Sequence, residues 1–163
     1  MTFLTEHGVA TDDSNVFRLV DKYKRLESET AAFTVPSAVE YVNALRALDK
    51  ATRVPKEARA MLGRHNAAHN RTATYTQLAR AAAAAEGLDE TLASHRTANS
   101  AYGKLGRALG EQIGMGFLSS ETLKAPFYSS SLGLGSSATP AGTEFEFVMH
   151  HELAKARVEL AWF

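Results

Sequence analysis

The segment that most constrains the fold is residues 70–114, NRTATYTQLARAAAAAEGLDETLASHRTANSAYGKLGRALGEQIG, which predicts two helices joined by an insert. Thr74 and Gln77 form a capping-box pattern, in which each side chain bonds the other's backbone N–H at a helix start. Residues 81–85 are all alanine, the residue type with the highest helix propensity. Gly87 is expected to end this first helix.

A second helix is expected from about residue 98 to Gly114, because its apolar residues recur every three or four positions. They are Tyr102, Leu105, Leu109 and Ile113. Three glycines have the same spacing: Gly103, Gly106 and Gly110. A glycine inside a helix costs about 1 kcal/mol relative to alanine. We therefore expect these glycines to permit a close approach, usually of a neighbouring backbone and more rarely of a DNA phosphate.

Helical patterns also precede this segment. An amphipathic helix is predicted over residues 14–30, and a capping-box pattern at Ser37 predicts the start of the next helix. The inner face of that next helix is expected to carry Val39, Val42, Leu45 and Leu48. A third helix is predicted to begin at Pro55. Its buried side is expected to carry Ala58, Met61, Leu62 and His65. These patterns suggest an N-terminal helical segment, residues 1–52, and a second domain, residues 53–163.

The C-terminal part of the chain has a different pattern. Glutamate and phenylalanine alternate within residues 143–149, which predicts a half-buried strand. The Gly/Ser-rich residues 129–143 are expected to form a mobile loop between this strand and another at 125–128. Residues 151–160 are expected to form a closing helix. The predicted fold class is therefore α+β and mostly helical, with an N-terminal helical pair packed on a winged-helix-like unit that contains a β-hairpin.

Charge is unevenly distributed, although the net charge of the chain is zero. Residues 53–107 carry nine Lys/Arg and four Asp/Glu, a net charge of +5, whereas residues 1–52 and 108–163 carry −2 and −3. A basic middle between acidic flanks indicates a surface that faces an anion. The chain has no cysteine, no secretory signal pattern and no apolar run of membrane-spanning length. We therefore expect a cytoplasmic protein without membrane contact.

No catalytic motif stands out. The sequence lacks both a G-x-S-x-G turn and a phosphate-binding loop. His65 and His69 are four residues apart and could share one face of a helix as metal ligands, with His95 or the 150–152 cluster completing the site. Two histidines specify little, however, and polar surface or capping roles are more common. We expect no catalytic residues, no metal and no cofactor.

The cations of the middle segment are the strongest functional signal: Arg71, Arg80, Arg96, Lys104 and Arg107. Arginine can bind a phosphate or a guanine edge through two parallel hydrogen bonds. Thr74 and Asn99 lie near the starts of the two predicted helices and complete the expected nucleic-acid-binding set. The alternative interpretation is that these charges cover an exposed helix face and pair with Glu86, Asp89 and Glu111.

The same region resembles a known family. The motif T-x-T-Y-T-Q-L-A-R-A-A followed by N-S-A-Y-G-K-L-G-R-A-L-G is similar to the N-terminal segment of bacterial restriction-type HNH endonucleases, over roughly residues 54–163. A fainter similarity is to the winged-helix domain of DNA alkyltransferases. The sequence contains neither the HNH nuclease module nor the reactive Pro-Cys-His-Arg motif of the alkyltransferases. The resemblance therefore implies DNA recognition without cleavage or alkyl transfer, linked to restriction or mobile-element (phage) defence.

The predicted function is non-catalytic binding of double-stranded DNA, with the helix at 98–114 near a groove and the loop at 129–142 as a wing tip. The alternative is a protein-interaction module or small inhibitor that acts on nucleic-acid machinery. Neutral net charge supports this alternative, as do Asp21, Glu27 and Glu29, which could meet a basic protein partner.

Overall fold

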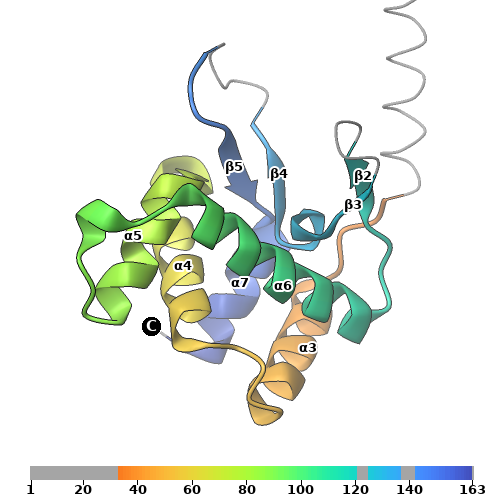
Figure 1. The fold of residues 1–163 in the computed structure, drawn as a ribbon. Helices are drawn as coiled ribbons and strands as arrows, with labels where there is room; N and C mark the ends of the chain where they lie inside the picture. The colour runs from red at the N-terminus through yellow and green to blue at the C-terminus, as the bar shows by residue number, and fades with distance from the viewer. Residues whose placement is uncertain (1–32, 121–124, 137–141, 163) are drawn as a thin grey trace, which may run out of the picture. The chain divides into compact units, whose positions relative to one another are not determined.

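The computed structural model describes residues 33–120, 125–136 and 142–162, and its larger compact unit comprises Val35–Phe163 (Figure 1). The helices are α3 (Ala38–Lys50), α4 (Lys56–Ala67), α5 (Tyr75–Ala85), α6 (His95–Ile113) and α7 (His151–Leu160), with the 3-10 helices η1 (His69–Arg71), η2 (Glu90–Leu92) and η3 (Tyr128–Ser131). The strands are β1 (Thr72–Thr74), β2 (Leu118–Ser120), β3 (Ala125–Phe127), β4 (Gly133–Gly135) and β5 (Glu146–Met149). This is a mostly helical α+β fold, as expected. The helix predicted over 14–30 lies outside the described residues.

Side-chain caps determine where the helices begin. The capping box predicted at the start of α5 is present, with Thr74 accepting from the backbone N–H of Gln77 and Gln77 accepting from that of Thr74. Ser94 caps α6 by accepting from the backbone N–H of Arg96, so this helix begins three residues before the expected position. Gly114 ends α6 in the left-handed conformation, with φ of 83°, which glycine adopts without steric cost.

The helix α3 belongs to the same compact unit as α4 to α7. Its buried residues pack with α6 and α7, and the hydroxyl of Tyr41 donates to the backbone oxygen of Ser131 at 2.7 Å. The backbone N–H of Ala38 donates to Glu152 of α7 at 3.1 Å. The unit therefore begins at Val35, whereas the sequence analysis placed the boundary after residue 52. The apolar face of α3 requires this arrangement, because α3 buries it mainly against α6 and α7. Val39, which was predicted on that face, is instead 64% exposed.

The strands form two antiparallel sheets. In the three-stranded sheet the order is β1-β5-β4, and Phe147 of β5 lies opposite Ala73 of β1. The strands β2 and β3 form a separate pair. The strand predicted at 143–149 is confirmed as β5, but its predicted pairing with residues 125–128 is wrong. Its partner β4 comes from the Gly/Ser-rich segment that was expected to be a loop.

The start of that Gly/Ser-rich segment is buried rather than mobile. The hydroxyl of Ser131 donates to the backbone oxygen of Gly106 at 2.7 Å, and His150 Nε2 lies 2.7 Å from the backbone oxygen of Ser130. Gly133 pairs with Met149 so closely that a side chain at this position would collide with the backbone of Val148. The connection between β4 and β5 is therefore shorter than the predicted wing at 129–142. A glycine strand has no alternating side chains, so the period-two pattern could not reveal it.

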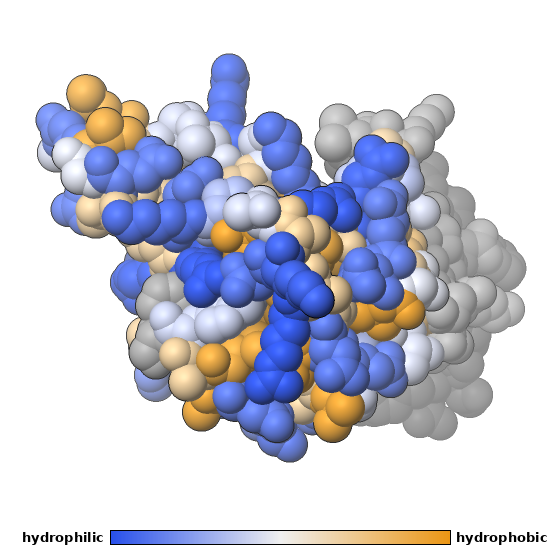
Figure 2. Space-filling model, turned by 90° about the horizontal axis from the view of Figure 1, so that it is seen from below, coloured by the Kyte–Doolittle hydropathy of each residue, from blue (hydrophilic) through white to orange (hydrophobic). Residues whose placement is uncertain are grey.

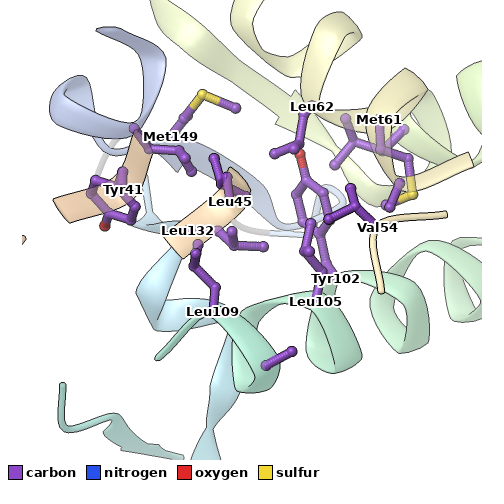
Figure 3. Close-up of a cluster of buried hydrophobic side chains, with 14 of the residues drawn as sticks. Tyr41, Leu45, Val54, Met61, Leu62, Tyr102, Leu105, Leu109, Leu132 and Met149 are labelled. Atoms are coloured by element: carbon purple, nitrogen blue, oxygen red, sulfur yellow. The ribbon is translucent and has the colours of Figure 1, made fainter. Parts of the chain in front are cut away.

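The hydrophobic core lies between α3, α4, α6 and the sheet. Figure 3 shows Leu45 and Leu62 among the side chains that approach Tyr102 and Leu105 of α6, and these residues are between 0% and 3% exposed. An aromatic cluster continues the core toward β5, where the ring centroids of Tyr102 and Phe147 are 6.1 Å apart. Burying a leucine or phenylalanine side chain contributes roughly 2 kcal/mol to stability. These contacts position α6 with one side in the core.

The glycines of α6 have different surroundings. A Cβ at Gly106 would lie 3.0 Å from Ser129 Cα and closer still to the carbonyl oxygen of Tyr128, so the expected close backbone approach is confirmed here. At Gly110 a Cβ would collide with the ring of Phe117, which is a side chain and not a neighbouring backbone. At Gly103 a Cβ would have no neighbour within 4 Å. The described structure thus explains two of the three glycines, and η3 covers the α6 surface at Gly106.

These surroundings predict opposite effects for two alanine substitutions. Gly106→Ala should lower the free energy of unfolding by roughly 2 kcal/mol, because neither α6 nor the η3 backbone can move freely away from the new methyl group. Gly103→Ala should raise it by up to about 1 kcal/mol through higher helix propensity. Urea unfolding followed by circular dichroism measures both. Equal effects of the two substitutions would contradict the contact of η3 with α6.

Candidate functional site

Four of the seven predicted site residues lie on the exposed side of α6: Arg96, Asn99, Lys104 and Arg107. The opposite side of the helix is anchored in the core by Tyr102 and Leu109, both 0% exposed. Ser100 lies four residues from both Arg96 and Lys104, so these three residues follow one ridge of the helix. Figure 1 shows α6 running across the front of the unit, ahead of α4 and α7. The helix therefore presents a row of polar and basic side chains on a fixed support.

The basic residues of α6 differ in their partners. Arg107 Nε donates to Glu111 at 2.9 Å, and its guanidinium lies 5.1 Å from the ring centroid of Tyr128. The hydrogen bond to Glu111 raises the pKa of Arg107. The pairing of Arg107 with Glu111 is thus confirmed. Within the described part of the chain, the side chains of Arg96 and Lys104 form no hydrogen bond or ion pair. These two cations are the ones left to meet an external anion.

The other three predicted site residues lie elsewhere. Arg71 precedes β1, and its Nη1 donates to His151 Nδ1 of α7 at 3.0 Å. Thr74 uses its hydroxyl to cap α5. Arg80 is exposed on α5. These three residues thus come from other elements, and only the α6 group lies on a single helix.

The N-terminus of α5 already holds an anion. Both the backbone N–H and the hydroxyl of Thr76 donate to Glu144 Oε1, at 2.9 and 2.7 Å. A helix N-terminus favours a negative group because its first N–H groups lack partners within the helix. The carboxylate of Glu144 meets that need from the segment before β5. The first turn of α5, expected to contact phosphate, instead joins two parts of the fold.

A groove of about 1020 Å³ lies beside α6, between the start of α4, the alanine run of α5 and the connection that contains η2. Its floor is mainly alanine and leucine: Ala58, Ala79, Ala82, Ala83, Ala101, Leu105 and Ala108. Leu88 and Leu92 also line it and are 60% and 81% exposed. Figure 2 shows apolar residues exposed among hydrophilic ones on the side of the molecule that is seen from below. The groove provides an apolar surface directly beside the basic ridge of α6.

The charges of the groove are unevenly arranged. Its α6 wall carries Arg96, Ser100 and Lys104 and no carboxylate. Its carboxylates belong to the other walls: Glu57, Glu86 and Asp89. Asp89 accepts the backbone N–H and hydroxyl of Thr91, and these hydrogen bonds lower its pKa. The groove was not predicted from the sequence, although Ala82 and Ala83 of the alanine run at 81–85 line it together with Leu88 and Leu92.

His65 is a core residue with both ring nitrogens in use. Nε2 lies 2.8 Å from the backbone oxygen of Phe147 and must donate its proton there, so Nδ1 accepts from the hydroxyl of Tyr102 at 3.0 Å. The ring is 0% exposed, and burial lowers its pKa to about 4. The prediction that α4 buries His65 is confirmed, while the surface or capping role is wrong for this residue. A metal interpretation would require these hydrogen bonds to be broken.

Comparisons with protein-family models, with curated proteins and with solved structures found no match to this chain. Within the described residues, no helix has the length and apolar character needed to cross a membrane. Asp21, Glu27 and Glu29, which supported the protein-interaction alternative, lie outside those residues.

The buried state of His65 predicts a pH-dependent stability. Because its folded pKa of about 4 lies below the unfolded value of 6.5, the unfolded state binds the proton more strongly between these values. Stability should therefore fall as pH drops through this interval, by roughly 3 kcal/mol for a shift of this size. Burial also lowers the pKa of His150, which acts in the same direction.

Urea unfolding at several pH values measures the loss of stability, and an NMR titration of the His65 ring measures its own protonation. A ring of His65 that titrates close to the ordinary histidine pKa would contradict its place in the core.

Proposed function

We propose that this chain binds double-stranded DNA through the exposed side of α6 and catalyses no reaction. The observation that carries the proposal is the pair of cations on this helix, Arg96 and Lys104, which have no partner among the described residues. An α-helix fits the major groove of B-form DNA, and its side chains then reach base edges and phosphates. Because the opposite side of α6 is buried, the helix can be presented without rearranging the core.

The order of elements supports a winged-helix-like arrangement. From α4 the chain runs helix, strand, helix, helix, and then two strands of one sheet in the order β1-β5-β4, with the β2-β3 pair inserted before β4. In such folds the third helix of this series is the one that enters the groove, and the connection between the last two strands lies beside it. In this chain the corresponding parts would be α6 and the β4–β5 connection. A fold alone does not establish a function, so the proposal depends on the α6 side chains.

The side chains of α6 would have different roles on DNA. Arg96 and Lys104 would contact phosphate oxygens or guanine edges, and the amide of Asn99 matches the hydrogen-bonding edge of adenine. Arg107 would contribute less, because approach of a phosphate competes with its bond to Glu111. Arg71, Thr74 and Arg80 are not part of this surface. The resemblance to restriction-type HNH endonucleases supports a role in restriction or mobile-element defence.

Removal of the two unpaired cations should weaken DNA binding. Each lost phosphate contact lowers affinity roughly tenfold at about 0.1 M salt, and it lowers the slope of log affinity against log salt by about 1. Arg96→Ala with Lys104→Ala should therefore bind a mixed-sequence duplex much more weakly than the unchanged protein. Fluorescence anisotropy at several salt concentrations measures both quantities.

Lys155→Ala is the matched control, since Lys155 is an exposed cation on α7 that pairs with Glu152. If this control weakens binding as much as the double variant, α6 is not the contact surface. Absence of any salt-sensitive binding by the full chain would refute the DNA proposal itself.

A further inference from the structure

We propose that the groove beside α6 binds an amphipathic organic anion, with its apolar body on the alanine floor and its anionic group on the α6 wall. We further infer that this ligand and DNA compete for Arg96 and Lys104. The inferred competition between ligand and DNA rests on the proposed DNA binding, whereas binding of the ligand in the groove does not.

The size and lining of the groove fit a small amphipathic molecule. Its volume of about 1020 Å³ is in the range of small-molecule sites. Alanines on the facing sides of α5 and α6 leave the space open, because their methyl groups fill little of the gap between the helices. Leu88 and Leu92 both line the groove and are 60% and 81% exposed, and exposed apolar side chains that are grouped, unlike single ones, mark binding surfaces. An apolar body in the groove would cover Leu88 and Leu92 together.

The charge of the ligand follows from the α6 wall. Arg96 and Lys104 offer hydrogen-bond donors only, and the hydroxyls of Thr97 and Ser100 lie on the same wall. The carboxylates of Glu57, Glu86 and Asp89 lie on the remaining walls and would repel an anionic group placed there. An anion is therefore directed toward α6. Among the described residues that line the groove, the other cation is Arg53, which precedes α4.

The proposed DNA surface and the groove share residues. Arg96, Ser100 and Lys104 lie on the ridge of α6 that separates the groove from the outer face of the helix. A side chain bonded to an anion in the groove cannot at the same time extend to a phosphate on DNA. Asn99 and Arg107 do not line the groove and would stay available. Ligand binding would thus weaken DNA binding without unfolding the protein.

Titration of the full chain with sodium decanoate, below its micelle concentration, tests the groove without DNA. Calorimetry measures affinity, and NMR shifts locate the site; decyltrimethylammonium, with the same chain and opposite charge, is the comparison probe. We expect shifts at the groove and roughly tenfold weaker binding of the cationic probe, as for loss of a charge-assisted hydrogen bond. Equal affinities for the two probes, or shifts away from the groove, would overturn the proposal.

Two variants test separately the basic α6 wall and the apolar edge of the groove. Arg96→Ala with Lys104→Ala should weaken decanoate binding, and so should Leu92→Asp, which changes an exposed side chain and should preserve folding. Lys155→Ala is again the control. Decanoate affinity that is unchanged in both test variants would refute the groove site.

A final titration of decanoate into the protein–duplex complex tests competition. Release of DNA supports it, whereas a complex that retains both decanoate and DNA overturns it. Decanoate binding by a chain that binds no duplex would leave the groove site standing and refute both the DNA proposal and the competition.

Discussion

A short chain of hydrogen bonds through His65 joins the parts of this fold that come from distant regions of the sequence. The imidazole of α4 donates to the backbone of β5 at Phe147 and accepts from Tyr102 of α6. A buried polar ring costs free energy unless its nitrogens are hydrogen-bonded. The position of α6 relative to the sheet is therefore determined by these directional hydrogen bonds as well as by apolar contacts. Everything inferred about the exposed side of α6 depends on this fixed orientation.

The two sides of α6 show how one helix can meet opposing requirements. Toward the protein, Gly106 allows η3 to approach the helix, and the hydroxyl of Ser131 donates to the backbone oxygen of the same residue. Toward α5, the side chains of both helices are mainly alanines, which are too small to fill the space between the helices, so the groove stays open. The remaining face carries charged residues with few internal partners. Small residues thus have opposite consequences on this helix. Gly106 permits close contact with η3, whereas the alanines leave open space toward α5.

Much of the helical architecture could be predicted from the sequence, because caps and apolar spacing are local signals. The capping box of Thr74, the end of α6 at Gly114 and the burial of His65 are examples. The strand pairing could not be predicted in the same way. The strand β4 consists of two glycines and one leucine, and β1 has only three residues, so neither shows an alternating pattern. Pairing with β5 forms these strands, and that information is non-local.

The candidate site was predictable only in part for a similar reason. Exposure of Arg96, Asn99, Lys104 and Arg107 follows from helical periodicity, which α6 obeys. The partners of each side chain depend on tertiary contacts. No local pattern predicted that Tyr128 would lie beneath Arg107 or that Glu144 would reach the first turn of α5. Residue type therefore predicted which side chains could bind an anion. Only the fold showed which of them already have a partner within the protein, such as Arg107 with Glu111.

The bond from Tyr41 to Ser131 has a practical consequence for anyone who shortens this chain. A fragment that starts at residue 53 would lose α3 and with it the cover over parts of α6 and α7. The newly uncovered apolar area would favour self-association, because exposed patches of this kind promote aggregation. Shortened versions should therefore retain everything from Val35 onward.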